Sequence, residues 1–530
     1  MLRDDNSSHW QAGALREMQS QWECETWRLV ARSDAVAAGK QVISCRWVFD
    51  AKIADFMVAV WKARLVARGF EQVEGEDFFD WYFGAVRPST VRFFFAVSAH
   101  YGLRVYQADV CTAYLNASLD DVVVYMEQPE GFERKGPNGE HERDTVCLLQ
   151  RALYGLRQSA RQWGMTLLRY MSSLGFTRGG ADSQLFVLRR DGAVLLVAVC
   201  VDDLLMAASS DALRVEFMGK LGIRFKIKDV GEAQRAIGFG IDQSPDRTFI
   251  KLHLSTYIAT ASARFQLDVS GGAHDMPAPL SMVRACAAAH PTDAEVAEVV
   301  ETYTSLVGAL IFITTYVRVD AVASVHILTR YMGRPGHLHL RLAMRVLQYL
   351  YHTRTYGLTY RRGDSFDVSA AFVPETKPAH GLHAGSDSDW AVGPSCTAFV
   401  IMMCGAAVGW AARLQRCSSL SSAEAEFYAL SEAVAETVHF RNLLAEIGVV
   451  LDSPTVIYCD SRGARLMAMD LASSKRTRHI HRRWYFVAFY VEEGQVLVVK
   501  LDGSRNFADC LSKATGGKLF AAQRAYLLGV

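Results

Sequence analysis

Residues 194–207 read Val-Leu-Leu-Val-Ala-Val-Cys-Val-Asp-Asp-Leu-Leu-Met-Ala, so two adjacent aspartates, Asp202 and Asp203, interrupt an otherwise apolar run. Burying two like charges side by side costs several kcal/mol unless a positive charge meets them. A hairpin with the pair at its turn would expose both carboxylates at one edge of a packed sheet. The alternative interpretation is an ordinary solvated Asp-Asp turn.

A second acid has a similar setting. The run Val105-Tyr106-Gln107-Ala108-Asp109-Val110 predicts a strand with one carboxylate near its end, and Tyr114 follows five residues later. Three carboxylates that converge from two strands suit Mg²⁺, which prefers oxygen ligands and shares the phosphates of a substrate. Two such ions about 3.5–4 Å apart stabilise the attacking and leaving oxygens of an in-line displacement. Tyr114 could pack against an incoming sugar, or it could be a core aromatic residue.

Composition sets limits on the class of protein. The chain has 530 residues, which corresponds to about three or four domains. Half the residues are hydrophobic and 21% are charged, so a largely disordered chain is excluded. The formal net charge is +1, so any nucleic-acid contact must come from local patches. The eleven cysteines form no C-x-x-C pair, which indicates reduced thiols and argues against a zinc ribbon.

The chain shows no sign of export or membrane insertion. It begins MLRDDNSSHW, without an apolar core for a signal peptide. The longest apolar stretches, 193–201, 307–317 and 397–412, fall short of the roughly 20 residues that span a bilayer. We therefore expect a soluble, intracellular protein without a membrane partner.

Three regions differ in their pattern. Up to about residue 240, short β-rich runs alternate with amphipathic helices. Residues 241–360 are mostly helical by the spacing of apolar positions in 303–313 and 342–350. Pro374, Pro378 and Gly381 indicate a linker. Residues 382–530 then predict a compact α/β unit of strand, hairpin, helix, strand and helix.

Four ordered strings resemble the polymerase of copia-type LTR retrotransposons, that is, the reverse transcriptase and RNase H portion of their Pol polyprotein. They are Lys62-Ala63-Arg64-Leu65-Val66-Ala67-Arg68-Gly69-Phe70, Gln107-Ala108-Asp109-Val110, Leu153-Tyr154-Gly155-Leu156-Arg157-Gln158 and Val201-Asp202-Asp203. The resemblance implies a multidomain α+β and α/β fold: a right-hand polymerase followed by an RNase H-like domain. Fingers and palm would occupy 1–240, thumb and connection 241–381, and the RNase H-like domain 382–530.

The resemblance also assigns roles in the polymerase. Asp109, Asp202 and Asp203 would be catalytic and would hold two Mg²⁺, which Mn²⁺ could replace. Tyr114 would be the steric gate that favours deoxynucleotides. The other expected substrate contacts are Lys62 and Arg64 at the triphosphate, and Gly155 and Gln158 in the floor beneath the templating pair. The two cations could instead form a solvated strand edge, and Gln158 could be a plain surface residue.

A second set of strings resembles the RNase H domain of the same elements. They are Gly385-Ser386-Asp387-Ser388-Asp389-Trp390-Ala391, Ser421-Ser422-Ala423-Glu424-Ala425-Glu426-Phe427-Tyr428-Ala429, Ile457-Tyr458-Cys459-Asp460-Ser461 and Phe507-Ala508-Asp509-Cys510-Leu511. The resemblance implies a second two-metal site with Asp387, Glu426, Asp460 and Asp509 as catalytic residues, the first three as metal ligands.

Two choices of acid rest on local pattern. Ser421-x-x-Glu424 is a capping box, in which the glutamate reaches back to the cap amide, so Glu426 is the expected ligand. Phe427, Leu430, Val434 and Val438 would form the apolar face of the helix and Gly448 its C-cap. Asp387 is preferred because it is the first acid of the motif, which leaves Asp389 as a strand-end or turn carboxylate.

A basic run lies between these acids. Its cations are Lys475, Arg476, Arg478, Arg482 and Arg483. Such a run is an electrostatic footprint for a phosphate backbone, here that of an RNA–DNA hybrid. A nuclear-localisation signal or a solvated loop is the alternative.

Several positions depart from the family pattern. Cys200 stands where tyrosine is usual, Ala160 where proline is usual, and Tyr485 where histidine is usual. Residues 81–86, Trp-Tyr-Phe-Gly-Ala-Val, replace a typical Thr-Phe-Ser-Pro-Val stretch. Substitutions of this kind each risk about 1–3 kcal/mol through packing or backbone effects.

The sequence therefore predicts an RNA-directed DNA polymerase with a fused RNase H. The expected partners are an RNA template, a DNA or tRNA primer, dNTPs, the RNA–DNA hybrid and other parts of the same Pol polyprotein. The expected location is a cytoplasmic virus-like particle and the nucleus. One alternative is a catalytically decayed retrotransposon remnant that only binds nucleic acid, and another keeps only the RNase H active.

Overall fold

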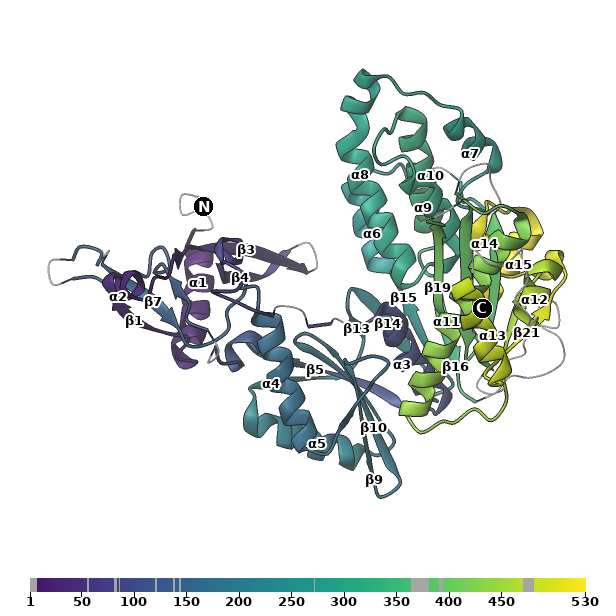
Figure 1. The fold of residues 1–530 in the computed structure, drawn as a ribbon. Helices are drawn as coiled ribbons and strands as arrows, with labels where there is room; N and C mark the ends of the chain where they lie inside the picture. Colours follow the sequence, from purple (N-terminus) through teal and green to yellow (C-terminus); the bar gives the residue numbers. More distant parts are fainter. Residues whose placement is uncertain are drawn as a thin grey trace.

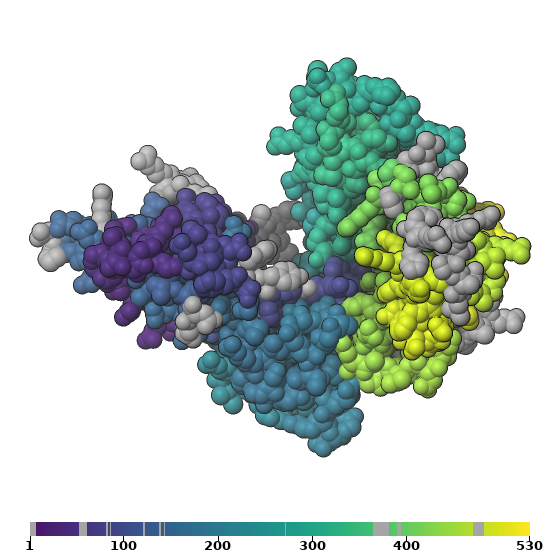
Figure 2. Space-filling model, viewed as in Figure 1, coloured from purple at the N-terminus to yellow at the C-terminus, as the bar shows by residue number. Residues whose placement is uncertain are grey.

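The computed structural model describes most of the chain. The described residues are 7–54, 57–80, 83–84, 86–119, 122–136, 139–142, 144–270, 272–363, 381–389, 394–416, 418–469 and 481–530. Figure 1 shows them as fingers and palm on one side, a helical thumb, and a C-terminal α/β unit beside the thumb, and Figure 2 shows the same view in space-filling form. The predicted multidomain α+β and α/β fold class is confirmed. Of the expected linker, Pro374 and Pro378 lie outside the described residues.

The fingers are built mainly from the first part of the chain. Their elements are α1 (Ser7–Glu23), β1 (Trp27–Ala31), α2 (Arg32–Ala37), β2 (Val42–Ile43), β3 (Cys45–Ala54), β4 (Met57–Ala67), β6 (Tyr125–Met126) and β7 (Thr145–Leu149). Strands β1, β7, β6 and β2 form one sheet, and β3 pairs with β4 in a two-stranded ribbon. Along β4, Ala63 and Leu65 are buried while Lys62 and Arg64 alternate with them, so both cations share the other face of the strand.

The palm is a six-stranded sheet in the order β12-β5-β11-β10-β9-β8. Its elements are α3 (Pro88–His100), β5 (Arg104–Val110), η2 (Ala113–Asn116), α4 (Ser159–Ser173), β8 (Thr177–Arg178), β9 (Leu185–Arg190), β10 (Ala193–Cys200), β11 (Asp203–Ala208), α5 (Asp211–Arg224) and β12 (Ile227–Glu232). The two apolar runs of the sequence thus form adjacent strands, with α4 and α5 packed in one core with the sheet.

Helix α3 belongs to more than one part of the molecule. Phe93, Phe94 and Phe95 follow one another and are each at most 1% exposed. Consecutive positions on a helix point in different directions, so neighbours must surround it on all sides. The ring of Phe93 lies 6.1 Å from that of Phe440 in the C-terminal unit, and the ring of Phe95 lies 5.9 Å from that of Phe239. The palm and the C-terminal unit therefore share one hydrophobic core.

A small sheet and a helical bundle form the next part. Its elements are β13 (Arg235–Ala236), β14 (Phe239–Gln243), β15 (Phe249–His253), α6 (Ser255–Arg264), α7 (Leu280–Ala287), α8 (Asp293–Tyr316), η3 (Val319–Ala321), α9 (Val322–Thr329), α10 (His337–His352) and β16 (Gly357–Arg361). Strand β14 runs across residue 240, and β16 returns from the bundle to pair with β15. The small sheet thus lies at both ends of the bundle, because the chain enters the bundle after β15 and leaves it into β16.

Helix α8 is the longest helix of the bundle. Thr292 and Glu295 form a complete capping box at its start. By length and composition it is the one helix in the described part of the chain that could cross a membrane. Tyr303, Leu306 and Leu310 are fully buried in the core that α9 and α10 also enter, and 33% of the apolar window of α8 is buried.

The C-terminal unit has a five-stranded sheet in the order β19-β18-β17-β20-β21. Its elements are β17 (His383–Asp389), β18 (Cys396–Met403), β19 (Ala406–Leu414), α11 (Ser422–Glu446), β20 (Thr455–Cys459), α12 (Arg462–Met469), α13 (His481–Glu492), β21 (Val496–Lys500), η6 (Gly503–Arg505), α14 (Asp509–Ser512) and α15 (Gly517–Leu528). β17 pairs in parallel with β20, and β20 with β21, so the ends of these strands meet at one edge.

Candidate active sites

The palm aspartates lie where three strands meet. Cys200 pairs with Asp203 across the β10–β11 hairpin, which leaves Val201 and Asp202 as its two-residue turn. Asp203 in turn pairs with Asp109 on β5. The Asp202 carbonyl accepts a hydrogen bond of 2.9 Å from the Val110 amide. The predicted hairpin with its acids at the turn is thus present.

The turn itself is strained. Val201 has a φ of 64°, a left-handed conformation that is rare for a β-branched residue. A position of this kind persists only where the surrounding structure imposes it. Here the hydrogen bonds between β5, β10 and β11 hold the turn in place. The strained backbone of Val201 comes directly before the two acids, Asp202 and Asp203.

The pairing of Asp109 with Asp203 sets up the electrostatics of the palm site. Directly opposed residues on adjacent strands share a face, and like charges there are destabilising without a cation between them. Gln107, two residues before Asp109, donates a hydrogen bond of 2.9 Å to Asp203, which stabilises the negative charge of the Asp203 carboxylate. No choice of one carboxylate oxygen each from Asp109, Asp202 and Asp203 places all three within 4.8 Å of one another.

Aromatic rings connect the turn to the fingers. Tyr114 lies on η2 and its ring centre is 4.6 Å from that of Tyr154, edge to face. Burial raises the pKa of Tyr114, and the nearby Asp202 charge raises it further. The Arg64 guanidinium lies 6.0 Å from the Tyr154 ring centre. Tyr114 and Arg64 therefore lie on the same side of the palm as the acids, and Lys62 shares the face of β4 that carries Arg64.

Gly155 and Gln158 both lie at contacts between the palm and the first part of the chain. Gly155 has a φ of 94°, and a Cβ there would overlap the Ala67 carbonyl oxygen of β4. Gln158 is 2% exposed, so it is not a surface residue. Its amide donates to the Asp77 carbonyl at 3.1 Å and accepts from Gln72 at 3.1 Å. Both residues hold the fingers against the palm, and the Gln158 amide is already engaged.

Most departures from the family pattern in the polymerase part that the structure describes gather around one cavity. It has a volume of about 280 Å³ and reaches the catalytic turn at Val201 and Asp203. Its lining includes the departing positions Phe83, Gly84, Ala160 and Cys200. Burial raises the pKa of the Cys200 thiol to about 12, so this cysteine is a neutral apolar wall of the cavity. Trp81, Tyr82 and Ala85 lie outside the described residues.

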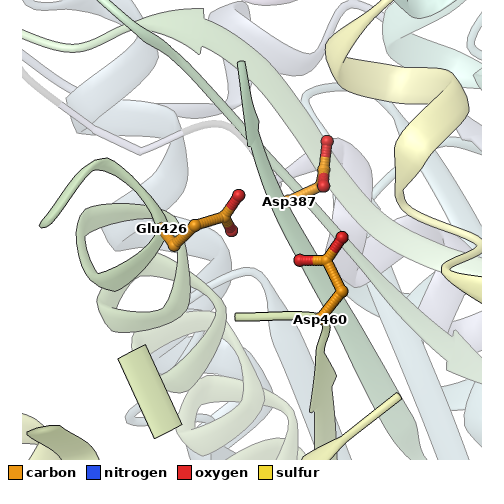
Figure 3. Close-up of side chains that lie close together, drawn as sticks. All are labelled: Asp387, Glu426 and Asp460. Carbon is orange, nitrogen blue, oxygen red and sulfur yellow. The ribbon is translucent and has the colours of Figure 1, made fainter. Parts of the chain in front are cut away.

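The C-terminal unit brings three predicted acids together. Asp387 comes from β17, Glu426 from the second turn of α11, and Asp460 from the residue after β20. One carboxylate oxygen of each lies within 4.8 Å of the others, and the three side chains point toward one another in Figure 3. Within the described part of the chain this is the one group of His, Cys, Asp or Glu residues with such spacing.

The three carboxylates are electrostatically strained. Burial, then the Asp387 and Asp460 charges, raise the pKa of Glu426 to about 9. Burial also raises the pKa of Asp387 to about 7 and, with Asp509, raises that of Asp460. Glu426 Oε2 is buried without a hydrogen-bond partner. A buried orphan oxygen among three acids is what a divalent cation would satisfy, and an all-oxygen donor set suits Mg²⁺.

Further residues at this site were not predicted from the sequence. Lys513 lies 2.6 Å from Asp509 and 3.9 Å from Asp387, and Asp509 stands beside the three acids. Asn506 donates to Asp387 at 3.2 Å, and the Ser512 hydroxyl also donates to Asp387. Lys513 follows Asp509 by four residues around a short helix, and side chains with this spacing lie on one face. This spacing could have indicated from the sequence that Lys513 lies beside Asp509.

The structure separates the alternative acids. The Ser421 hydroxyl accepts from the Glu424 amide at 3.2 Å, as expected for an N-cap. The Glu424 carboxylate reaches the Leu420 amide at 2.8 Å, one residue before the predicted cap amide, so the predicted box was wrong in that detail. Gly448 follows the C-cap with a φ of 85°. Asp389 is the last residue of β17, apart from the three clustered acids.

The basic run is only partly described. Lys475, Arg476 and Arg478 lie outside the described residues. Arg482 is exposed on α13. Arg483 donates to the Ser431 hydroxyl at 2.7 Å and lies 4.6 Å from the Tyr428 ring centre, so it ties α13 to α11. Tyr485 is 55% exposed on the same helix.

The chain is similar to known reverse transcriptase and transposon proteins. Residues 24–276 match a family model described as reverse transcriptase (RNA-dependent DNA polymerase). The chain is 31% identical over 506 residues to a retrovirus-related Pol polyprotein from transposon TNT 1-94 of Nicotiana tabacum, covering 94% of this chain and 36% of that protein. It is 30% identical over 329 residues to a putative transposon Ty5-1 protein of Saccharomyces cerevisiae, covering 62% of this chain and 99% of that protein.

The chain spans about a third of the length of the Pol polyproteins it matches. Among solved structures, a foamy viral protease-reverse transcriptase in complex with dsDNA is similar with a TM-score of 0.41 at 10% identity. That similarity covers 93% of this chain and 83% of the other.

Proposed function

Because the chain belongs to the reverse transcriptase family of copia-type retrotransposon Pol polyproteins, we propose that it extends a primer on an RNA template and hydrolyses the RNA of the resulting hybrid. The observation that carries the proposal is the register of the palm. Asp203 pairs with Asp109 while Asp202 occupies the adjoining turn. No packing role explains three acids held at the meeting of three strands.

In the polymerase, Asp109, Asp202 and Asp203 would hold two Mg²⁺, for which Mn²⁺ could substitute. Bound metal would supply positive charge to the attacking and leaving oxygens. The residues of the chain position the reactants: the primer 3′-hydroxyl attacks the α-phosphate of a dNTP, and pyrophosphate leaves. Tyr114 beside Asp202 would limit the space at the sugar, and Arg64 and Lys62 on β4 would meet the triphosphate.

In the RNase H, Asp387, Glu426 and Asp460 would hold the metal and Asp509 would complete the acidic set. Bound metal would supply a nucleophilic water and stabilise the leaving oxygen. Asn506 and Ser512 orient Asp387 through hydrogen bonds to its two oxygens. The 2′-hydroxyl is the group by which such a site can distinguish RNA from DNA.

The polymerase is tested by incorporation of labelled dTTP on poly(rA)–oligo(dT), with Mg²⁺ or Mn²⁺. We expect metal-dependent extension that Asp202→Asn with Asp203→Asn abolishes. A folded protein that binds the primer–template but extends nothing would instead be a decayed remnant. The cavity lined by Cys200, Ala160 and Phe83 would then be the place to look for the defect, because it adjoins the catalytic turn.

A further inference from the structure

Two adjoining cavities form a groove across the junction of fingers and palm. The fingers-side cavity is about 790 Å³ and the palm-side cavity about 340 Å³, and both are lined by Ser118 and Arg151. We call this continuous surface the basic groove. Its chemistry is defined by Trp22, Trp27, Arg28, Arg151, Arg169 and Arg224. Figure 1 shows α4, which carries Arg169, reaching from the palm toward the fingers.

The charge of the basic groove is one-sided. Arg151, Arg169 and Arg224 converge on the palm-side cavity, whose lining contains no acid. Arg28 adds a fourth cation on the fingers side, where Glu25 is the one carboxylate of the lining. In the part of the chain that the structure describes, none of the four arginines forms an ion pair with a carboxylate, unlike Arg161 and Arg214 nearby on α4 and α5. An anion entering this groove would meet guanidinium groups with their donors available.

Indole rings line the same groove. Trp22 is 55% exposed, which is unusual for the largest apolar side chain, and its ring centre lies 6.4 Å from that of Phe132, edge to face. Trp27 lines the same cavity. Guanidinium groups that track phosphates, interleaved with rings on which bases stack, are the recognition pattern for single-stranded nucleic acid. A duplex would offer phosphates but no unstacked base for Trp22, so the rings favour an unpaired strand.

We propose that the basic groove binds an unpaired stretch of nucleic acid, the single-stranded template RNA next to the polymerase site. Asn116 lines the palm-side cavity and lies on the same short helix η2 as Tyr114, so the groove begins close to the expected nucleotide site. The identity of the strand as template rests on the proposed function. Binding of a single strand by this groove does not.

The test is equilibrium binding of labelled oligo(rA) and of a blunt RNA–DNA hybrid to the full chain, by fluorescence anisotropy across a range of salt concentrations. The groove variant combines Arg151→Gln, Arg169→Gln and Arg224→Gln. We expect oligo(rA) binding to weaken about tenfold or more. The slope of log Kd against log salt should fall by about 2, because each single-strand phosphate contact contributes roughly 0.7. Arg284→Gln, at an exposed arginine of α7 outside the groove, should change neither value.

A second variant tests the rings separately. Trp22→Ala should weaken oligo(rA) binding by about fivefold to a hundredfold, the range for loss of one base stack, without changing the salt slope. Equal weakening for the hybrid and for oligo(rA) in the groove variant would overturn the proposal, since it would reveal only a general loss of positive charge. Unchanged oligo(rA) binding would also overturn it. Neither measurement requires catalysis, so failure of primer extension and failure of the groove are distinguishable.

Discussion

Glu424 and Glu426 lie two positions apart on α11 and have opposite roles in the structure. Glu424 accepts a hydrogen bond from the backbone before the helix, whereas Glu426 presents an unpartnered buried oxygen to Asp387 and Asp460. Replacing each by glutamine changes one charge and almost no volume. The pair is therefore a matched test of which acid serves the RNase H.

We expect Glu426→Gln to reduce hybrid cleavage by about 100-fold or more, because a metal ligand is lost. Glu424→Gln should leave cleavage near the unmodified level and cost less than about 1 kcal/mol of stability, since the glutamine carbonyl can still accept the hydrogen bond of the Leu420 amide. Cleavage of a labelled RNA–DNA hybrid and the thermal midpoint measure the two effects. Equal loss in both variants would contradict the assignment of Glu426.

The raised pKa values of the same acids predict how stability changes with pH without metal. The folded state holds protons on Asp387 and Glu426 up to about 7 and about 9, whereas the unfolded chain releases them near 3.8 and 4.5. The folded state thus binds more protons between these limits, so stability falls as pH rises through this window. The thermal midpoint in EDTA should decline over that range. Saturating Mg²⁺ should remove the decline, because metal binds the ionised carboxylates.

At the residue scale the sequence predicted the acids better than their neighbours. Asp387, Glu426 and Asp460 follow short recognisable strings, and the structure places their oxygens together. The sequence did not single out Lys513 or Asn506, because the residues around each of them do not indicate a role at the site. Only the fold brings the two side chains close to Asp387. Gln158 was expected in the floor beneath the templating pair, and the sequence did not indicate that its amide is bonded to Gln72 and Asp77, a contact across more than 80 residues of chain.

At the element scale, the fit of β4 against the palm depends on one glycine. Gly155 and Gly192 both have positive φ, 94° and 78°, but only Gly155 faces a neighbouring backbone. Gly192→Ala should cost about 1–2 kcal/mol from the left-handed conformation alone. Gly155→Ala should cost more than about 3 kcal/mol, because its Cβ would also overlap the Ala67 carbonyl. Denaturant unfolding measures both, and equal costs would contradict the close approach of β4.

Strands and helices were predicted to different degrees. The runs 105–110 and 194–207 form β5 and the β10–β11 hairpin, because a buried strand needs a short apolar run and the acids can only lie at its end. The environment of α3 was not predictable from its own residues. Three successive phenylalanines carry no helical periodicity, and their burial depends on partners from the small sheet and the C-terminal unit.

At the scale of the whole molecule, Arg92 joins three parts. It is 4% exposed on α3 and donates to the carbonyls of Val408 at 2.7 Å, Thr315 at 2.7 Å and Tyr316 at 3.2 Å. Its guanidinium also lies 3.7 Å from the Trp410 ring centre. Burial lowers the pKa of Arg92 to about 10, so it still carries its charge at neutral pH. The palm, the bundle and the C-terminal unit thus meet at one cation.

Arg92→Met should destabilise the protein by about 3 kcal/mol or more, because three buried carbonyls lose their donor. We also expect the unmodified protein to unfold in one calorimetric transition and the Arg92→Met variant in two, as the C-terminal unit separates from the palm. Arg413→Met, which removes the surface ion pair with Glu432, is the matched control and should cost less than about 1 kcal/mol. One unchanged transition in Arg92→Met would contradict a shared core.

The order of the parts was predictable, and their contact was not. Motif order along the chain places palm before RNase H, since each string belongs to one unit. The direct contact of the two units through α3 and Glu446 depends on surfaces that show no motif. Glu446, at the end of α11, accepts from the Gly180 and Ala181 amides of the palm at 2.7 and 2.6 Å.

Two separate carboxylate sites on one chain would act on the same hybrid. The most direct test uses one substrate, an RNA template and DNA primer with a different label on each strand, in Mg²⁺. The unmodified chain should lengthen the primer and cut the RNA. Asp202→Asn with Asp203→Asn should stop only primer extension, and Glu426→Gln should stop only RNA cleavage. Loss of both activities in either well-folded variant, or of neither, would contradict two independent sites.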